Sequence, residues 1–404
     1  MSVQPRPTMA PGLTVLLLSL LLGLQPITTD LYLPALPLLT EGFGASMAQA
    51  QLTLTALLLA FGVSQLIWGP LSDRFGRRPI LLIGMNAYVL ASIASTLSSS
   101  MEMLIVWRTL QGAAMGAGVM CARAIVRDLY APAQGARVMS KGLSGLGLIA
   151  CLSPPLGGLL ADLFNWRISL FTLSIFGAIS LALIALRFEE TLPKKNLQAL
   201  QGGHLLQTWL LILRNPTFIA FSALATASYG CLFTFLASSS FVFIKVLGLS
   251  TTHYGLLVFS MAFSYLLGTF LCRYLLNRFD VRRTVAIAGV LSLSGGTIAG
   301  VLALLGWQSA WTIMPPFYLF MLGHGIQMPC SQSGVVGPFP QSAGAASALN
   351  GFLMMLAVFL IGNWLGTHMD GTIFPLVYGI WFWSVMVALI AWTLVQKQGR
   401  RGAS

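Results

Sequence analysis

The residue most able to do chemistry in this sequence is Asp30, a carboxyl group inside a long apolar stretch. The chain has only ten Asp and Glu residues, and the other nine fall at or near the ends of apolar segments. An ionisable group in the interior of a membrane is costly, so by default it marks an ion or substrate pathway. Asp30 is therefore a candidate proton-coupling residue.

Arg108 is the second candidate, because it also lies within an apolar segment. A helical rise of about 1.5 Å per residue places Asp30 and Arg108 roughly 7 to 9 Å below the same membrane surface. A carboxyl group that alternates between a dry environment and the neighbourhood of an arginine can take up and release a proton. We expect Asp30 and Arg108 to be coupled. The alternative role for Arg108 is to pin a helix in place.

Composition identifies the elements that hold these residues. Hydrophobic residues make up 56% of the chain and charged residues only 8%, and the mean hydropathy is +0.83. Soluble domains carry roughly 25% charged residues. Apolar runs of about 20 residues are long enough to cross a bilayer as helices. Twelve such runs are predicted, near residues 12–36, 51–70, 79–98, 103–126, 139–161, 168–187, 217–241, 252–275, 284–305, 311–334, 342–365 and 373–395.

The twelve helices divide into two halves of six. The predicted halves are residues 1–187 and 215–404, and a polar cytoplasmic loop at 188–214 joins them. The run DRFGRR at 73–78 is echoed by NRFDVRR at 277–283, which supports an internal repeat of the kind found in transporters. The fold class is therefore an all-α membrane protein with twelve transmembrane helices in two six-helix halves.

Charge predicts the orientation of these helices. With both termini in the cytoplasm, only Arg167 and Lys245 among the loop Lys and Arg residues fall on the outer side. The net charge of +12 reflects this topology and does not indicate a nucleic-acid partner. The five cysteines show no metal-ligand or redox spacing, so we expect them to serve packing, with no metal site and no cofactor.

A conformational latch is predicted at the turn between the second and third helices, where the run GPLSDRFGRRP occupies residues 69–79. Gly69 permits the close approach of helices, and Asp73 can sit against the positive N-terminal end of another helix. Arg77 can bridge Asp73 to Asp128 at the end of the fourth helix. The simpler alternative is a basic loop with a turn glycine, which explains the arginines but not Asp73.

The run at 69–79 matches the signature loop of the major facilitator superfamily. The resemblance implies that the latch meets the start of the eleventh helix, around residues 342–347. The run RTLQGA at 108–113 is similar to the Arg-x-x-Gln-Gly signature of drug/proton antiporters in this superfamily. The run SPPLGG at 153–158 resembles their Gly-Pro-x-x-Gly-Gly motif, with serine in place of the first glycine. Its candidate residues are Pro154, Pro155, Gly157 and Gly158, for which a kink in a packed helix is the alternative.

Two further runs resemble the Bcr/CflA family of multidrug efflux proteins. They are TDLYLPALP at 29–37 and ARAIVRDLY at 122–130. The resemblance implies proton-driven export of drugs such as bicyclomycin, chloramphenicol or sulfonamides, and in some members of small metabolites. The implied partners are small-molecule drugs, protons and the lipid bilayer, and we expect a monomer in a bacterial inner membrane.

Drug contact requires an adaptable apolar cavity with a few polar groups. The candidate substrate-binding residues are Tyr32, Tyr229, Phe233, Phe235, Tyr265, His324, Gln327, Asn350, Met354 and Met355. Packing in the core or against lipid is the alternative role for each aromatic residue and methionine. For His324, the alternative is a histidine hydrogen-bonded to a neighbouring helix.

Two other functions remain open at this level. A passive facilitator or a metabolite transporter has the same fold, although an embedded Asp30 favours ion coupling. The run GLSG at 142–145 has the form seen around intramembrane serine protease nucleophiles, and His324 is the nominal base. Twelve spans in two halves argue against a protease. No phosphate-binding loop is present, which argues against direct drive by ATP.

Overall fold

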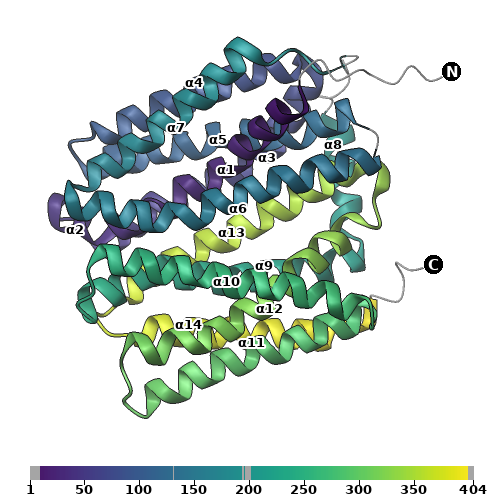
Figure 1. The fold of residues 1–404 in the computed structure, drawn as a ribbon. Helices are drawn as coiled ribbons and strands as arrows, with labels where there is room; N and C mark the ends of the chain where they lie inside the picture. The colour runs from purple at the N-terminus through teal and green to yellow at the C-terminus, as the bar shows by residue number, and fades with distance from the viewer. Residues whose placement is uncertain (1–9, 131, 193–194, 196–201, 399–404) are drawn as a thin grey trace. The chain divides into compact units, whose positions relative to one another are not determined.

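All regular secondary structure is helical within the residues that the computed structural model describes, which are 10–130, 132–192, 195 and 202–398. Figure 1 shows the order of the helices along the chain. The first half contains α1 (Pro11–Asp30), η1 (Leu33–Ala35), α2 (Leu36–Phe43), α3 (Met47–Phe75), α4 (Arg77–Thr96), α5 (Met101–Leu129), α6 (Pro132–Leu163) and α7 (Trp166–Arg187). Contacts between residues divide the chain into two compact units, residues 1–202 and 203–404.

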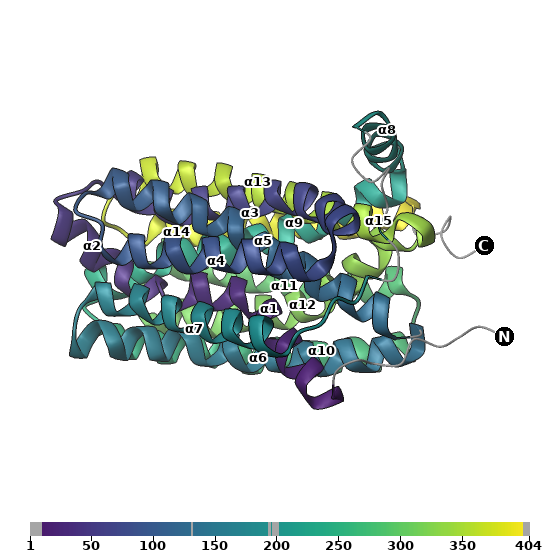
Figure 2. The ribbon, with the colours of Figure 1, turned by 90° about the horizontal axis from the view of Figure 1, so that it is seen from above.

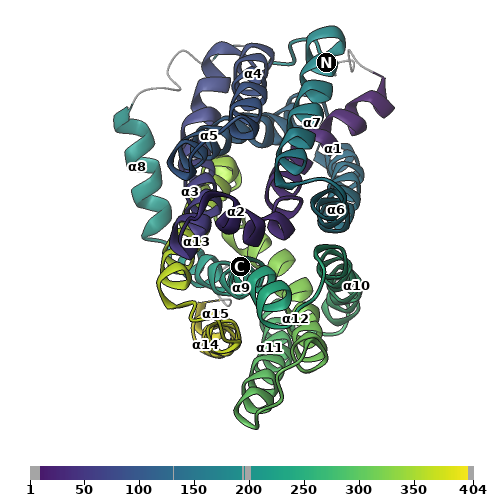
Figure 3. The same cartoon turned by 90° about the vertical axis from the view of Figure 1, so that its left-hand side faces the viewer.

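The second half repeats the pattern of six long helices. It contains α8 (Gly202–Leu213), α9 (Pro216–Ser240), η2 (Phe241–Val246), α10 (Thr251–Leu276), α11 (Val281–Leu304), α12 (Ala310–Val336), η3 (Pro340–Ser342), α13 (Ala343–His368), α14 (Phe374–Trp392) and α15 (Leu394–Gln398). Figure 3, viewed along the long helices, shows each unit as a bundle.

Each of the twelve predicted spans coincides with a long helix. Within the described part of the chain, eleven helices are long and apolar enough to cross a membrane. The exception is α12, which has 27 residues but includes His324, Gln327 and three prolines that lower its hydropathy. Its length of 27 residues is nevertheless sufficient to cross a bilayer.

The segment predicted as a central loop contains a helix that the sequence analysis did not predict. Helix α8 has 12 residues, which is too few to span a bilayer. Figure 2 shows that α8 lies across the direction of the long helices of its own unit. Leu206 and Leu211 on α8 are exposed, while Ile212 packs into the core of the second unit. The helix was missed because its apolar run is short.

Glycines allow helices within the first unit to pack closely. A Cβ atom at Gly112 of α5 would overlap the backbone carbonyl of Leu57 on α3. A Cβ atom at Gly157 of α6 would overlap the carbonyl oxygen of Leu31, directly after α1. Small residues at such crossings are typical of membrane helices, where close van der Waals packing replaces a hydrophobic driving force.

Candidate functional site

Asp30 is the last residue of α1 and lies where the first span changes from an α-helix to the η1 turn. Its carboxylate accepts a hydrogen bond from the hydroxyl of Thr29 at 2.7 Å. The side chain is half-buried, and none of the ion pairs found among the described residues includes it. Asp30 is thus a carboxyl group within a membrane span that has a hydrogen-bond donor but binds no arginine or lysine among the described residues.

Arg108 is fully buried on α5 and is held by three groups. Its guanidinium donates to Oε1 of Gln111 at 2.7 Å and to the carbonyl of Thr28 at 3.0 Å. Its Cζ atom lies 4.3 Å from the centre of the Tyr32 ring, a cation–π contact. Nε of Arg108 has no hydrogen-bond partner among the described residues. The structure therefore brings Arg108 to the backbone two residues before Asp30, but it does not bring the two charges into an ion pair.

The buried hydrogen bonds around Arg108 have a counterpart in the second unit. In the first unit, Gln111 on α5 donates to Ser92 on α4 at 2.6 Å. In the second unit, Gln327 on α12 donates to Ser292 on α11 at 2.8 Å. His324 occupies the place of Arg108, one turn before the glutamine, and its Nδ1 lies 2.8 Å from the hydroxyl of Ser228.

The two networks differ in charge. The α1 partner in the first unit is Thr28, and its counterpart on α9 is Ser228, whose hydroxyl donates its proton to Oε1 of Gln327 at 2.6 Å. Arginine is always protonated in proteins, so Arg108 carries a fixed positive charge. Nδ1 of His324, in contrast, is hydrogen-bonded to a neutral hydroxyl, which requires no charge on the ring. The internal repeat is therefore present in buried side chains as well as in the loops, but only the first unit has a fixed positive charge at this place.

The predicted latch residues lie together in the first unit. Arg77 is 1% exposed, and its guanidinium binds Asp73 at 2.7 Å and Asp128 at 2.8 Å. It also donates to the hydroxyl of Ser72 at 2.7 Å. The nearest atom to a Cβ placed at Gly69 is Cε of Met120 at 3.5 Å, an ordinary van der Waals contact, and the role of Gly69 in close helix approach stays a prediction. The contact with residues 342–347 stays a prediction.

Glu190 is a member of this cluster that the sequence analysis missed. Its carboxylate accepts hydrogen bonds from the backbone N–H groups of Arg77 at 2.9 Å and Arg78 at 3.1 Å, at the N-terminus of α4. A negative charge is favourable there because the helix dipole is positive at that end. Gly76 precedes the helix with a φ of 112°, and a Cβ atom there would overlap the Glu190 carboxylate. No local pattern links Glu190 to a turn that lies 113 residues earlier.

The predicted antiporter motif lies inside α6. Pro154 and Pro155 interrupt the backbone hydrogen bonds of this helix. Gly157 then allows α6 to approach the carbonyl of Leu31, the residue after Asp30. The motif therefore fixes the backbone next to the embedded carboxyl group. Gly158 belongs to the same helical stretch.

Most of the predicted substrate-binding residues bond to neighbours in their own unit. The hydroxyl of Tyr32 lies 2.8 Å from that of Thr53, and the ring of Phe235 stacks on Phe317 with centroids 4.0 Å apart. Nδ2 of Asn350 donates to the sulfur of Met354 at 3.5 Å. Phe233 and Met355 are buried, as are Tyr32, Phe235, His324, Gln327, Asn350 and Met354. Only Tyr229 and Tyr265 are partly accessible.

Comparison with known proteins agrees with this architecture. The family model of the Major Facilitator Superfamily matches residues 18–362. Multidrug resistance protein D of Escherichia coli (strain K12) is 30% identical over 340 residues, which are 84% of this chain and 84% of that protein. The chloramphenicol resistance protein of Pseudomonas aeruginosa is 29% identical over 338 residues, or 83% of this chain and 79% of that protein.

A solved structure shows the same fold at low sequence identity. The crystal structure of a D-xylose–proton symporter superposes with a TM-score of 0.73 and 16% identity, covering 95% of this chain and 97% of that one. The chain belongs to the Major Facilitator Superfamily, and drug-resistance transporters of the Bcr/CflA type are among its relatives, as its motifs predict. This is a multi-pass membrane transporter, not an enzyme, so the protease alternative is set aside.

Proposed function

We propose that this transporter is a proton-coupled exporter of small-molecule drugs that works by alternating access. The observation that carries the proposal is Asp30, a carboxyl group within a membrane span whose described partner is a neutral hydroxyl. A carboxyl group held by a fixed arginine would remain ionised, whereas one bound only to a hydroxyl can exist in both protonation states. The names of the relatives, which refer to multidrug and chloramphenicol resistance, support drugs as the substrate class.

Arg108 supports the same mechanism. Its guanidinium is buried beside the backbone of Thr28, and its Nε–H group has no partner among the residues that the structure describes. A movement of the broken first span that brought the Asp30 carboxylate to this donor would favour its ionised form and release the proton. We propose that Asp30 and Arg108 are coupled in this way during transport, in an inner-membrane protein with both termini in the cytoplasm.

The test is efflux from proteoliposomes with an imposed pH gradient. Asp30→Asn should abolish gradient-driven chloramphenicol efflux while the protein still inserts at a normal level. Thr109→Val is a matched control, because the one side-chain hydrogen bond of Thr109 within the described residues is intrahelical, to the carbonyl of Ile105 at 2.7 Å. Full gradient-driven efflux by Asp30→Asn would refute proton coupling through this residue. If the wild type moves the drug only down the drug's own concentration gradient, at a rate that does not depend on the pH gradient, the protein is a passive facilitator.

A further inference from the structure

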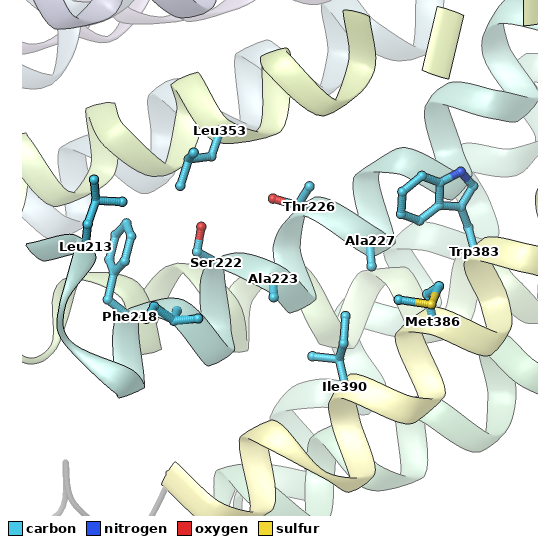
Figure 4. Close-up of a pocket in the computed structure, with 11 residues that line it drawn as sticks. Leu213, Phe218, Ser222, Ala223, Thr226, Ala227, Leu353, Trp383, Met386 and Ile390 are labelled. Atoms are coloured by element: carbon cyan, nitrogen blue, oxygen red, sulfur yellow. The ribbon is translucent and has the colours of Figure 1, made fainter. Parts of the chain in front are cut away.

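The second unit contains a cavity that has no part in the proposed coupling mechanism. It has a volume of about 430 Å³ and lies between α9, α13 and α14 (Figure 4). This volume falls within the range of small-molecule sites, about 300 to 1,000 Å³. Its walls are largely apolar and include Phe218, Leu353, Trp383 and Met386. None of the described residues that line it carries a charged side chain.

Two hydroxyl groups face this cavity from α9. Ser222 and Thr226 are one helical turn apart, so they lie on the same face of the helix. Figure 4 shows both hydroxyl oxygens directed into the space between α9 and α13. Ser222 is only 3% exposed, and neither hydroxyl has a hydrogen-bond partner within the described part of the chain.

Two other hydroxyls on the same helix bond to the preceding turn. Thr234 donates to the carbonyl of Gly230 at 2.8 Å, and Ser238 donates to that of Thr234. This bond to the preceding turn is the usual way in which serine and threonine are satisfied in a membrane helix. Ser222 is buried and Thr226 is partly exposed, and a hydroxyl that bonds to no protein group can bond to a molecule in the cavity. Ser222 and Thr226 therefore remain available for a ligand.

We propose that this cavity binds one neutral, lipophilic organic molecule whose hydrogen-bond acceptor is held by Ser222 and Thr226. Neutrality follows from the absence of a charged lining residue, since an unpaired charge in such a place is costly. A lipid acyl chain would fill the apolar space but would leave both hydroxyls unsatisfied. Trp383 and Met386 provide an aromatic face and an adaptable sulfur side chain for the body of the molecule.

The entrance to the cavity is on the surface of the second unit. Leu213 and Ile219 line it and are 39% and 47% exposed. Ile219 is the fourth residue of α9, near the start of a predicted membrane span. A lipophilic molecule dissolved at the edge of the bilayer can therefore reach the cavity directly.

The test uses benzophenone, which is neutral, lipophilic and carries a single carbonyl acceptor. On irradiation its carbonyl carbon bonds to a nearby side-chain carbon and its oxygen takes the hydrogen, so the labelled peptide gains the mass of the whole probe. In the purified full-length protein in nanodiscs, labelling of the α14 peptide that contains Met386 and Ile390 should saturate with probe concentration. The double variant Ser222→Ala with Thr226→Val should weaken the apparent affinity about tenfold.

Two further variants make the result decisive. Ala223→Phe should fill the cavity and abolish labelling at α14, while Thr234→Val should label as the wild type does, because Thr234 lies on the same helix but outside the cavity. Labelling that does not saturate, or that all variants share, would overturn the proposal. Binding is measured without a pH gradient, so failure here would leave proton-coupled export intact, and failure of Asp30-dependent export would leave this site intact.

Discussion

The carboxylate of Glu190 accepts a hydrogen bond from the backbone N–H of Arg77 at 2.9 Å, across 113 residues of chain. The same carboxylate binds the backbone N–H groups of Thr191 and Leu192, both at 3.0 Å. Glu190 therefore ties the segment that follows α7 to the first turn of α4. Because Arg77 lies in that turn, Glu190 acts as a positioning residue for the guanidinium that binds Asp128.

Glu190→Ala should destabilise the first unit, because two backbone N–H groups of α4 lose their acceptor and the helix loses a favourable negative charge. The expected loss is about 0.5 to 2 kcal/mol, in the range of helix caps. Thermal unfolding in detergent measures it. Glu189→Ala is the matched control, since Glu189 is exposed and makes no hydrogen bond or ion pair among the described residues. Glu190→Gln should recover part of the stability, because an amide oxygen still accepts both hydrogen bonds. Equal melting temperatures for the two alanine variants would contradict this role.

The two carboxylates bound to Arg77 should contribute unequally. The Asp128 side chain is 7% exposed, so Asp128→Asn leaves a buried guanidinium with less compensation and should cost about 3 to 5 kcal/mol. The Asp73 side chain is 38% exposed, so Asp73→Asn should cost about 1 kcal/mol or less. Unfolding measurements on both variants provide the comparison.

Asp73→Asn should instead alter the conformational balance of transport, because Asp73 is the proposed contact with another helix end. Accessibility of single cysteines from the two sides of the membrane reports this balance. A larger loss of stability in Asp73→Asn than in Asp128→Asn, with unchanged accessibility, would refute the latch as described.

Substitution of Arg108 should separate its structural role from its role in coupling. Arg108→Ala leaves Oε1 of Gln111 and the carbonyl of Thr28 without their donor, so we expect lower stability and weak efflux. Arg108→Lys keeps the charge but loses the planar fork that reaches both acceptors, so it should retain part of the function. The decisive measurement is the pH profile of efflux in Arg108→Lys, Asp30→Glu and the double variant. If the shift of the pH profile in the double variant is the sum of the shifts in the two single variants, Asp30 and Arg108 are not coupled and Arg108 only holds its helix in place.

Asp280, between α10 and α11, should make stability depend on pH. Its carboxylate caps α11 by accepting the backbone N–H of Arg283 at 3.0 Å, and this hydrogen bond, together with Arg282, lowers the pKa of Asp280 below its usual value. A carboxyl group whose pKa is lowered by folding stabilises the protein above its unfolded pKa, about 3.9, and this contribution disappears as the pH falls through the folded pKa. Asp280→Ala should therefore lower the melting temperature more at pH 7 than at a pH below the usual pKa of an aspartate. A constant difference between the two pH values would argue against a charged cap.

Much of the fold was predictable because its determinants are local. Each span requires a run of apolar residues that satisfies its own backbone hydrogen bonds in lipid, and all twelve predicted runs coincide with long helices. Helix α8 was not predicted, because the prediction looked for apolar runs long enough to cross a membrane and α8 has only 12 residues. Cys272 and Cys330, whose sulfurs lie 3.9 Å apart, are separated by 58 residues, so their spacing in the chain gave no signal of proximity.

The sequence alone determined the class of transporter, the spans, and Asp30 as an embedded carboxyl group, since these depend on hydropathy and on motifs read over a few residues. Only the tertiary structure decided which groups each polar side chain contacts. It gave Arg108 the carbonyl of Thr28 in place of the Asp30 carboxylate, and it brought Glu190 to the N-terminus of α4. It also left Ser222 without a partner beside a cavity. The physical reason is that a hydrogen bond depends on distances of about 3 Å between atoms from different helices, and helix packing sets these distances.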